Sequence, residues 1–340
     1  MTYLEPISKI FNEKVTSKRE NFILGNVNLF DFIMGKPKKG YINIAFVRDI
    51  PALQKHLRML PYTKRLITGW RKGSKCHHFI TLNDRMAKAV KEFIFPFHDI
   101  DHDVFKVYPL QSELKQPIMK RKEIVYIDHS STSNNNYKDI VRTLEKVGQV
   151  SKLPCLFISW KFRDVVDELI KDSEHVSTMG YDDYDFASHY GILTETRSKK
   201  YARFSITRKL MIYIASGIIP VLYRDCKAAI EYLQDEHLNF EIYDKAEDLK
   251  CLSERTYFPN WEPYRFTMEH NYTKIIEIMN RVGERYKYVV PDKIGMAKRL
   301  QVTYGNGEIK VFKSLQDVDK KLLEGPNKGR TITETKIIDV

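Results

Sequence analysis

The amino-acid sequence predicts an α/β protein built on parallel sheets, and three observations support that class. Short apolar segments of strand length alternate with amphipathic segments of helix length along most of the chain. The length of 340 residues allows two domains with cores of their own. The content of 43% hydrophobic and 12% aromatic residues is typical of globular proteins. We expect a first domain over residues 1–115, a second over 116–300 and a small appendage over 301–340.

The first domain contains one clear α/β unit. Its elements are the strands YINIAFV (41–47) and HHFITL (77–82) and the helix NDRMAKAVKEFI (83–94). The segment PFHDIDHDVF is expected to be the interdomain loop. Its HDIDHD run (98–103) looks like a set of metal ligands, but the spacing alone specifies no site. A segment rich in Lys and Pro, QSELKQPIMKRK (111–122), is predicted to be a linker.

The second domain is predicted to repeat strand and helix several times. The elements in order are EIVYID (123–128), the helix YKDIVRTLEKVGQV (137–150), LPCLFISW (153–160), the helix FRDVVDELIKD (162–172), HVSTMG (175–180), a helix at 184–190, GILTE (191–195), a helix at 205–216 and IIPVLY (218–223). This order is typical of a doubly wound sheet of Rossmann type, whose ligands bind at the carboxyl ends of the strands.

The appendage is predicted to be a small ββαβ unit. VTYGNGEIKVF is expected to form a hairpin with an Asn-Gly turn, and RTITETKII is expected to be a strand. Between them, SLQDVDKKLLE is predicted to be a helix whose Ser314 and Asp317 form a capping box.

The helix predicted at 205–216 begins in an unusual way. Its apolar face consists of Leu210, Met211, Ile214 and Ala215, with Ser205 expected as the N-cap and Gly217 as the C-cap. Two cations, Arg208 and Lys209, occupy the first turn. The positive end of the helix dipole disfavours cations there, by about 0.3–1 kcal/mol each.

An anionic ligand would account for these cations. At the carboxyl edge of a Rossmann sheet, a helix start binds anions, so Ser205, Thr207, Arg208 and Lys209 are predicted to form a cradle for a diphosphate. The alternative is that the two cations point into solvent or pair with Glu195.

The charge of the chain favours an anionic partner. The formal net charge is +12, which suits a nucleic acid, a nucleotide or an acidic membrane surface. From residue 51 to residue 83 there is no Asp or Glu. The cations in and beside this segment that we expect to bind an acceptor or its phosphates are Arg48, Arg58, Lys64, Arg65, Arg71 and Lys72. With Tyr62 and Trp70 between them, they suit a phosphate backbone and an unstacked base, although a solvated face is the competing interpretation.

Cysteine usage and hydropathy indicate a cytoplasmic protein. Cys76, Cys155, Cys226 and Cys251 are scattered without metal-ligand spacing, so we expect reduced thiols. No secretory signal opens the chain and no apolar run is long enough to span a membrane. The sequence therefore predicts a soluble protein, of unspecified oligomeric state, in the cytoplasm.

The segment from GILTE to IIPVLYRD (191–225) resembles the donor-binding half of GT-B glycosyltransferases. The matching features are Gly191 in the strand, the turn over 205–209, and the small-x-Gly-x-Pro-Val pattern formed by Ala215, Gly217, Pro220 and Val221. Upstream, NIAFVRDIPALQKHLR (43–58) is similar to a segment of the glucosyltransferases of serine-rich adhesins and of the α-glucosyltransferases that modify T-even phage DNA.

This resemblance implies a fold and an activity. The fold would be GT-B, with two Rossmann-like domains facing a cleft: a reduced acceptor-binding domain at 1–115 and a donor-binding domain at 116–300. The activity would be metal-independent transfer of a sugar from a nucleotide sugar, with a UDP-sugar favoured. Two departures matter: Ile212 stands where many such enzymes have Glu, and Arg48-Asp49 replaces a His-Asp pair.

The resemblance also implies roles for individual residues. Arg208 and Lys209 would stabilise the departing diphosphate. Asp49 would act as the base or positioning carboxylate for the acceptor, or else it caps the helix that follows it. The other residues expected on the donor side are Ser130, Ser131, Lys161, Arg163 and Tyr181, although Lys161 and Arg163 also suit a solvated loop.

A metal site is the less favoured interpretation of YDDYDF (181–186). The run looks like the Asp-x-Asp motif that holds manganese in the other glycosyltransferase fold. Its acids also suit the first turn of the helix predicted at 184–190, which we favour, so no obligatory metal is expected.

The acceptor is less sharply specified. The basic segment 51–83 favours duplex DNA, and the resemblance to the phage enzymes implies that this DNA carries a hydroxymethylated base. A cell-surface glycan or glycoprotein is the alternative acceptor. A different class, an inactive relative that binds nucleic acid, stays open because of the departures at Arg48 and Ile212 and the short first domain.

Overall fold

A computed structural model describes most of the second predicted domain and parts of the rest. The described residues are 22–26, 42–47, 78–93, 101–106, 108–114, 119–128, 137–194, 203–255, 258–285, 298–304, 307–312 and 332–339. The chain divides into two compact units, one made of Met1–Lys106 with Lys274–Val340 and the other of Val107–Thr273. The second unit thus begins before residue 116 and ends before residue 300, and the predicted domain ranges stay predictions.

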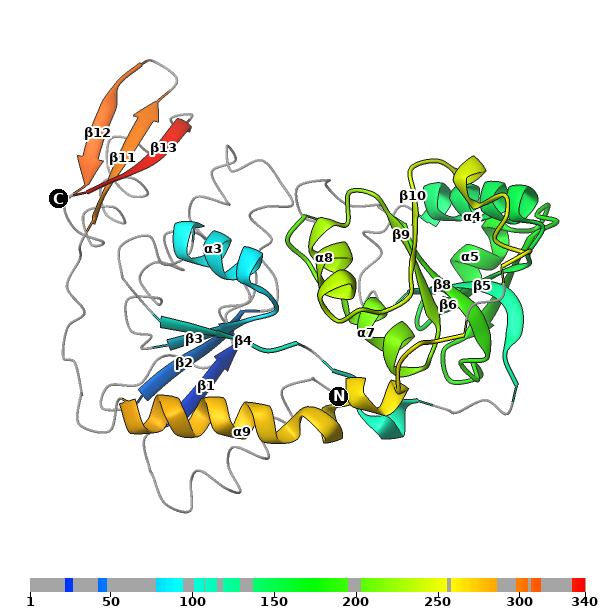
Figure 1. Ribbon diagram of the computed structural model, residues 1–340. Coiled ribbons are helices and arrows are strands. Elements are labelled where there is room, and N and C mark those ends of the chain that lie inside the picture. The colour runs from blue at the N-terminus through cyan, green and yellow to red at the C-terminus, as the bar shows by residue number, and fades with distance from the viewer. Residues whose placement is uncertain are drawn as a thin grey trace. The chain divides into compact units, whose positions relative to one another are not determined.

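The first unit holds a parallel sheet of four strands. They are β1 (Phe22–Asn26), β2 (Ile42–Val47), β3 (His78–Thr81) and β4 (Asp101–Val104), in that spatial order. Helix α3 (Asp84–Phe93) connects β3 to β4 and buries Met86 and Val90. The two strands and the helix predicted for this unit are confirmed (Figure 1).

The expectation of a loop through HDIDHD is wrong for residues 101–103, which lie in β4. Charged residues are tolerated in this strand because each aspartate meets a cation. Asp103 accepts a hydrogen bond from the buried His78 at 3.0 Å and pairs with Arg281, and Asp101 pairs with Arg285. Burial lowers the pKa of His78. Both arginines lie on α9 (Met268–Arg285), so these pairs tie the end of that helix to the edge of the sheet.

The appendage forms an antiparallel sheet of three strands. They are β11 (Lys298–Tyr304), β12 (Ile309–Phe312) and β13 (Ile332–Asp339), with β11 in the middle. The predicted hairpin and final strand are confirmed, and Gly307 supplies the left-handed backbone, with φ +81°, that its turn needs. The helix predicted at 314–324 lies outside the described residues.

The second unit is built on a parallel sheet of six strands. They are β5 (Arg121–Asp128), β6 (Cys155–Ser159), β7 (Val176–Gly180), β8 (Ser188–Leu193), β9 (Ile219–Tyr223) and β10 (Glu241–Tyr243). The spatial order is β10-β9-β8-β5-β6-β7. Counted from β5, this is the Rossmann order 3-2-1-4-5-6, which confirms the doubly wound sheet.

Helices cover both faces of this sheet. Helices α4 (Tyr137–Ser151) and α5 (Arg163–Leu169) lie on one face, and α7 (Arg208–Ala215) and α8 (Lys227–Asp235) lie on the other (Figure 1). Right-handed crossovers require this arrangement, because the connections leave β5 and β8 in opposite directions. The described part of the unit also contains three short 3-10 helices: η2 (Gln111–Glu113), η3 (Ala246–Leu249) and η4 (Pro263–Phe266).

The helix predicted at 184–190 is wrong. Residues 188–193 form strand β8, and all six are buried. A strand inside a parallel sheet is apolar on both faces, so its sequence lacks the alternation that would distinguish it from a buried helix. YDDYDF also does not open a helix; Asp183 N–H donates to Gly180 O at 3.2 Å in a turn after β7.

Candidate functional site

The two central strands of the six-stranded sheet, β5 and β8, mark its switch point. Their ladder ends at the pair Val125 and Gly191, before either strand ends. In sheets of this order, ligands bind where the connections diverge, outside the carboxyl ends of these strands. The candidate site is therefore the edge that follows Asp128 of β5 and Leu193 of β8.

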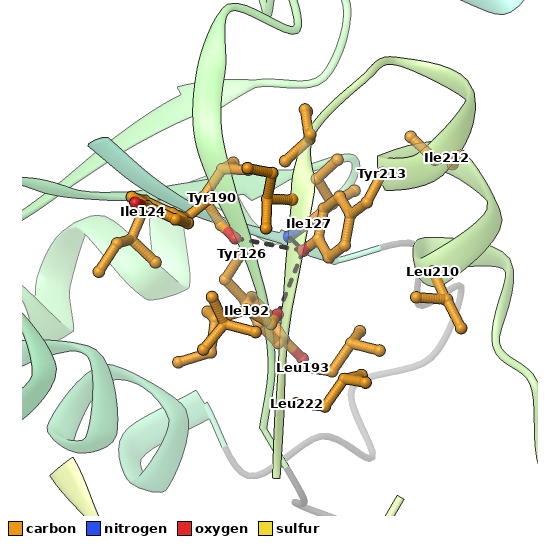
Figure 2. Packing of buried hydrophobic residues seen from close by; sticks show 14 of the residues in the cluster. Ile124, Tyr126, Ile127, Tyr190, Ile192, Leu193, Leu210, Ile212, Tyr213 and Leu222 are labelled. Carbon is orange, nitrogen blue, oxygen red and sulfur yellow. Dashed lines mark hydrogen bonds between the residues drawn. The ribbon is translucent and has the colours of Figure 1, made fainter. Parts of the chain in front are cut away.

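A tyrosine from α7 fills the gap in which the two strands part. The Tyr213 hydroxyl accepts the Ile127 N–H at 3.1 Å and shares its single proton between Val125 O and Ile192 O, each 3.2 Å away (Figure 2). The side chain is fully buried, and burial raises its pKa well above the ordinary value. This hydroxyl replaces the missing ladder bonds and joins β5 to β8.

Gly191 makes room for the Tyr213 ring. A Cβ atom at Gly191 would lie 2.5 Å from Tyr213 Cγ, much closer than carbon atoms approach without strain. The glycine that carries the donor-motif resemblance thus has a local structural reason, independent of any ligand.

The helix that follows the switch point begins later than predicted. Helix α7 runs from Arg208 to Ala215, and its N-cap is Thr207, whose hydroxyl accepts the Leu210 N–H at 3.4 Å. The prediction of Ser205 as N-cap is wrong; Ser205 is a buried residue of the preceding segment. An N-cap residue needs an extended backbone and a side-chain oxygen that can accept a hydrogen bond from the first turn, and Thr207 has both. Serine and threonine both carry such a hydroxyl, so residue type alone does not distinguish position 205 from position 207.

The rest of α7 agrees with the sequence. Leu210, Met211, Ile214 and Ala215 are buried, as the apolar pattern predicts. The helix ends with Gly217 in the left-handed conformation, with φ +63°. Gly217 N–H donates to Ile214 O, and the next residue donates to Tyr213 O, which is the hydrogen-bond pattern of a Schellman cap.

The first cation of α7 is held by a carboxylate. Arg208 Nη2 lies 2.6 Å from Glu113 Oε2, and the two side chains are 19% and 31% exposed. Burial lowers the pKa of Arg208 to about 9 and raises the pKa of Glu113. Glu113 also accepts the Leu110 N–H at 3.0 Å. Arg208 therefore neutralises the carboxylate of Glu113 in η2, the 3-10 helix that precedes β5.

The second cation lies over the central strand. Lys209 Nζ is 3.7 Å from the centroid of the Tyr126 ring, in a cation–π contact. Tyr126 belongs to β5, is almost fully buried and packs on Phe157 of β6 with a centroid distance of 5.1 Å. The ammonium group is thereby positioned beside the switch strand, at the start of α7.

The other predicted donor-side residues that the structure describes follow β6 and β7. Lys161 Nζ lies 5.1 Å from the centroid of the Trp160 ring. Within α5, Arg163 Nε lies 3.5 Å from Asp167 Oδ2. Tyr181, directly after β7, is half-buried, and burial raises its pKa.

Sequence reasoning missed three residues at this edge. Asp128, the last residue of β5, is 1% exposed and accepts a hydrogen bond from Tyr137 Oη at 3.0 Å. Ser159, the last residue of β6, is also buried, and Trp160 after it is 48% exposed. Each lies at the carboxyl end of a strand that the sequence predicts. Because ligands bind at these ends in Rossmann sheets, the predicted strand ends could have been used to identify these residues as candidates.

Several predicted site residues lie outside the described residues and stay predictions. They are Arg48, Asp49, Arg58, Lys64, Arg65, Arg71, Lys72, Ser130 and Ser131. Within the part of the chain that the structure describes, no cluster of His, Cys, Asp or Glu is arranged to hold a metal ion. No helix in that part has both the length and the apolar character needed to cross a membrane.

The described fold is of the predicted α/β class, with parallel sheets in both units. No protein-family profile and no curated protein matches the sequence. Among solved structures, similar chains include an O-GlcNAc transferase, a trehalose-phosphate synthase and TarM.

Three of these structures show the extent of the likeness. Pneumococcal O-GlcNAc transferase GtfA, in complex with UDP and GlcNAc, is 11% identical with a TM-score of 0.46, and the match covers 73% of this chain and 53% of that one. A variant of S. aureus TarM, with UDP bound, is 11% identical with a TM-score of 0.48, covering 72% and 51%. The trehalose-phosphate synthase of Burkholderia vietnamiensis is 11% identical with a TM-score of 0.46, covering 84% and 77%. The chain thus spans about half the length of GtfA, and likeness at this level leaves the activity open.

Proposed function

We propose that this protein is a GT-B glycosyltransferase that transfers a sugar from a nucleotide sugar, with a UDP-sugar as the first candidate, to an acceptor hydroxyl. One observation carries the proposal: the Lys209 ammonium group lies at the start of α7, beside the switch strand of a sheet with Rossmann order. A helix start at this edge supplies backbone N–H groups and the positive end of a dipole, and a lysine there adds a full charge. This combination suits a diphosphate.

The two cations of α7 have different roles in this proposal. Arg208 is already engaged with Glu113, so its charge serves mainly to hold the segment around Leu110 against the sheet. Lys209 is the residue that we assign to the diphosphate. The Thr207 hydroxyl accepts the Leu210 N–H as the N-cap of α7, and Ser205 is buried in the segment that precedes the helix.

The chemistry that the site serves is the departure of a nucleoside diphosphate. The bond between the anomeric carbon and the diphosphate oxygen breaks, and its electron pair leaves with the diphosphate. The acceptor oxygen bonds to the anomeric carbon and gives up its proton. Lys209 and the start of α7 stabilise the negative charge that develops on the leaving group. We assign the acceptor proton to Asp49 on the sequence resemblance, and we propose that no metal is required.

The acceptor that we propose is a hydroxymethylated base in duplex DNA. The support for DNA is the acid-free basic segment 51–83 and the net charge of +12, and the hydroxymethylated base is taken from the sequence resemblance to the phage enzymes. A base would have to leave the stack to present its hydroxyl group. A glycan or glycoprotein acceptor, and an inactive protein that binds nucleic acid, are the outcomes that the acceptor experiment below separates from this proposal.

Donor binding is tested with Lys209→Met and a matched control. The control is Lys227→Met, because Lys227 is an exposed cation at the start of α8, the next helix on the same face. We expect calorimetry with UDP and a panel of UDP-sugars to show about tenfold or greater loss for Lys209→Met and no change for Lys227→Met. If Lys209→Met binds UDP as tightly as the wild type does, the proposal that the diphosphate lies at the start of α7 is refuted.

The acceptor is tested by transfer and by salt dependence. Labelled UDP-sugars are incubated with duplex DNA that does or does not contain 5-hydroxymethylcytosine, using the wild type and Asp49→Asn. We expect label only on the modified DNA, loss of transfer but not of UDP binding in Asp49→Asn, and DNA affinity that falls steeply between about 50 and 200 mM salt. Transfer to a glycan instead would refute the DNA acceptor. DNA binding without transfer to any acceptor would identify the inactive class.

A further inference from the structure

An apolar pair is exposed on an edge strand of the appendage. Strand β12 lies at one edge of the three-stranded sheet, and among the described strands it pairs only with β11 (Figure 1). Its residues Ile309 and Val311 are 58% and 43% exposed. They lie on one face of the sheet, because successive side chains of a strand point to opposite faces. Exposed β-branched residues on an edge strand favour the addition of a further strand.

The opposite face of the same strand carries a pair of charges. Lys310 Nζ lies 3.2 Å from Glu308 Oε1, and these side chains are 35% and 37% exposed. A lysine on an edge strand commonly prevents strand addition. Here a carboxylate lies two positions before the lysine. The effect of the lysine therefore depends on the register in which a second strand pairs with β12.

The pattern from Glu308 to Val311 is complementary to itself when two copies run antiparallel. In the register centred on Ile309, Glu308 lies opposite the second copy's Lys310, and Lys310 lies opposite the second copy's Glu308. On the other face the two Ile309 side chains lie opposite each other, and the Val311 side chains lie diagonal to them. Opposite charges and β-branched pairs at such positions stabilise antiparallel strands. The register centred on Lys310 brings two lysines together instead, which is destabilising.

We propose that the chain forms a symmetric dimer in which β12 pairs antiparallel with β12 of a second copy. The two appendages then share one sheet, with the strand order β13-β11-β12-β12-β11-β13. A contact in which both copies use the same surface closes with two chains. The contact is short, so we expect a dissociation constant in the micromolar range, about 1–100 µM. This inference does not depend on the proposed function.

Charge reversal tests the dimer and its register. Glu308→Lys gives a strand with two lysines, and Lys310→Glu gives a strand with two glutamates. Each variant alone brings like charges together between the copies, so we expect its dissociation constant to rise about tenfold or more. An equimolar mixture restores opposite charges at both positions and should form a heterodimer. The readout is the mass by light scattering over a concentration series, with an affinity tag on one variant to detect the heterodimer.

The matched control for charge is Glu168→Lys. Glu168 pairs with Lys171 at 2.9 Å on the surface of α5, in the second unit. This variant changes the net charge by the same amount as Glu308→Lys, so it should dimerise as the wild type does. Mixing the two β12 variants also controls for folding, because a second variant could not restore dimerisation to an unfolded appendage.

Cysteine crosslinking measures the register without altering these charges. Directly opposite residues of antiparallel strands have Cα atoms about 4.5–5.5 Å apart, which suits a disulfide. Ile309→Cys should therefore crosslink to its copy under mild oxidation. Val311→Cys should not, because its two copies lie about four residues, or about 14 Å, apart along the strands. Both variants carry Cys251→Ser, which removes an exposed thiol.

Several results would overturn this inference. One is a wild type that stays monomeric up to about 0.5 mM. Another is a wild-type dimer whose dissociation constant is the same in Glu308→Lys, because the contact would then lie elsewhere. A mixture of the two charge variants that is no more dimeric than either alone refutes the register centred on Ile309. Crosslinking of Val311→Cys as efficient as that of Ile309→Cys refutes it as well.

Discussion

Replacing Gly191 with alanine would drive a methyl group into the ring of Tyr213. The new Cβ atom would lie 2.5 Å from Tyr213 Cγ and 2.6 and 2.7 Å from the two Cδ atoms. The ring is fully buried, and its hydroxyl is bonded to backbone groups of both β5 and β8. The ring cannot retreat without giving up these bonds, so the substitution should strain the centre of the sheet.

The magnitude follows from two contributions. Overpacking a buried site costs about 1–3 kcal/mol. If the ring shifts, the Ile127 N–H is left buried without its acceptor, which costs a further ~1–3 kcal/mol. We therefore expect Gly191→Ala to lower the free energy of unfolding by about 2–6 kcal/mol, a large share of the ~5–15 kcal/mol typical of a domain.

Urea denaturation followed by tryptophan fluorescence measures this loss. Trp261 is a suitable reporter, because its indole N–H donates to Ile214 O on α7 at 2.9 Å. The matched control is Gly180→Ala at the end of β7, where the new methyl group would meet only the carboxylate of Asp183, an exposed side chain that can move away. A loss under about 0.5 kcal/mol for Gly191→Ala would refute the reasoning, as would an equal loss in a Tyr213→Ala background, where the clash is absent.

Three further substitutions test other contacts of the second unit. Arg208→Met should lower the free energy of unfolding by about 1–3 kcal/mol, because Glu113 is left partly buried without its cation; Glu113→Gln in that background should recover most of the loss in urea denaturation. Thr207→Ala should cost about 1 kcal/mol through the lost cap, and Thr207→Ser should retain the stability. Burial lowers the pKa of Lys120 from 10.5 to about 8, so between these pH values the unfolded chain holds a proton that the folded chain lacks, and stability should rise with pH. Lys120→Met should abolish that rise in denaturation curves taken across the pH range, and Lys122→Met, at an exposed lysine, should preserve it.

The sequence predicts most of the sheet because its strands are short apolar runs between turn residues. The runs at 123–128, 153–160 and 175–180 correspond to β5, β6 and β7 with shifts of a few residues at their ends. The second half of β8 corresponds to the predicted strand GILTE (191–195), but the prediction of a helix through residues 188–190 is wrong. Their approach depends on Phe186 in the left-handed region, with φ 57°, which a bulky aromatic residue rarely adopts.

The candidate site is predictable in type but not in its contacts. The unusual cations at the start of α7 are visible in the sequence, since helix starts favour acids. The partner of Arg208 is not visible, because Glu113 lies 95 positions earlier and is brought close only by the fold. For the same reason, no local pattern shows that Lys209 lies over Tyr126 or that Tyr213 reaches the backbone of β5.

The division of the chain into units has a consequence for how the protein folds during synthesis. The second unit is one continuous stretch, Val107–Thr273, inserted between the two parts of the first. Asp101 and Asp103 of β4 leave the ribosome early, but their partners Arg285 and Arg281 follow only after the whole second unit has been made. Because chains emerge from the N-terminus and domains fold as units, the inserted unit can complete its core while the first unit still waits for its last helix. The part of the protein that is encoded first is therefore the part that is finished last.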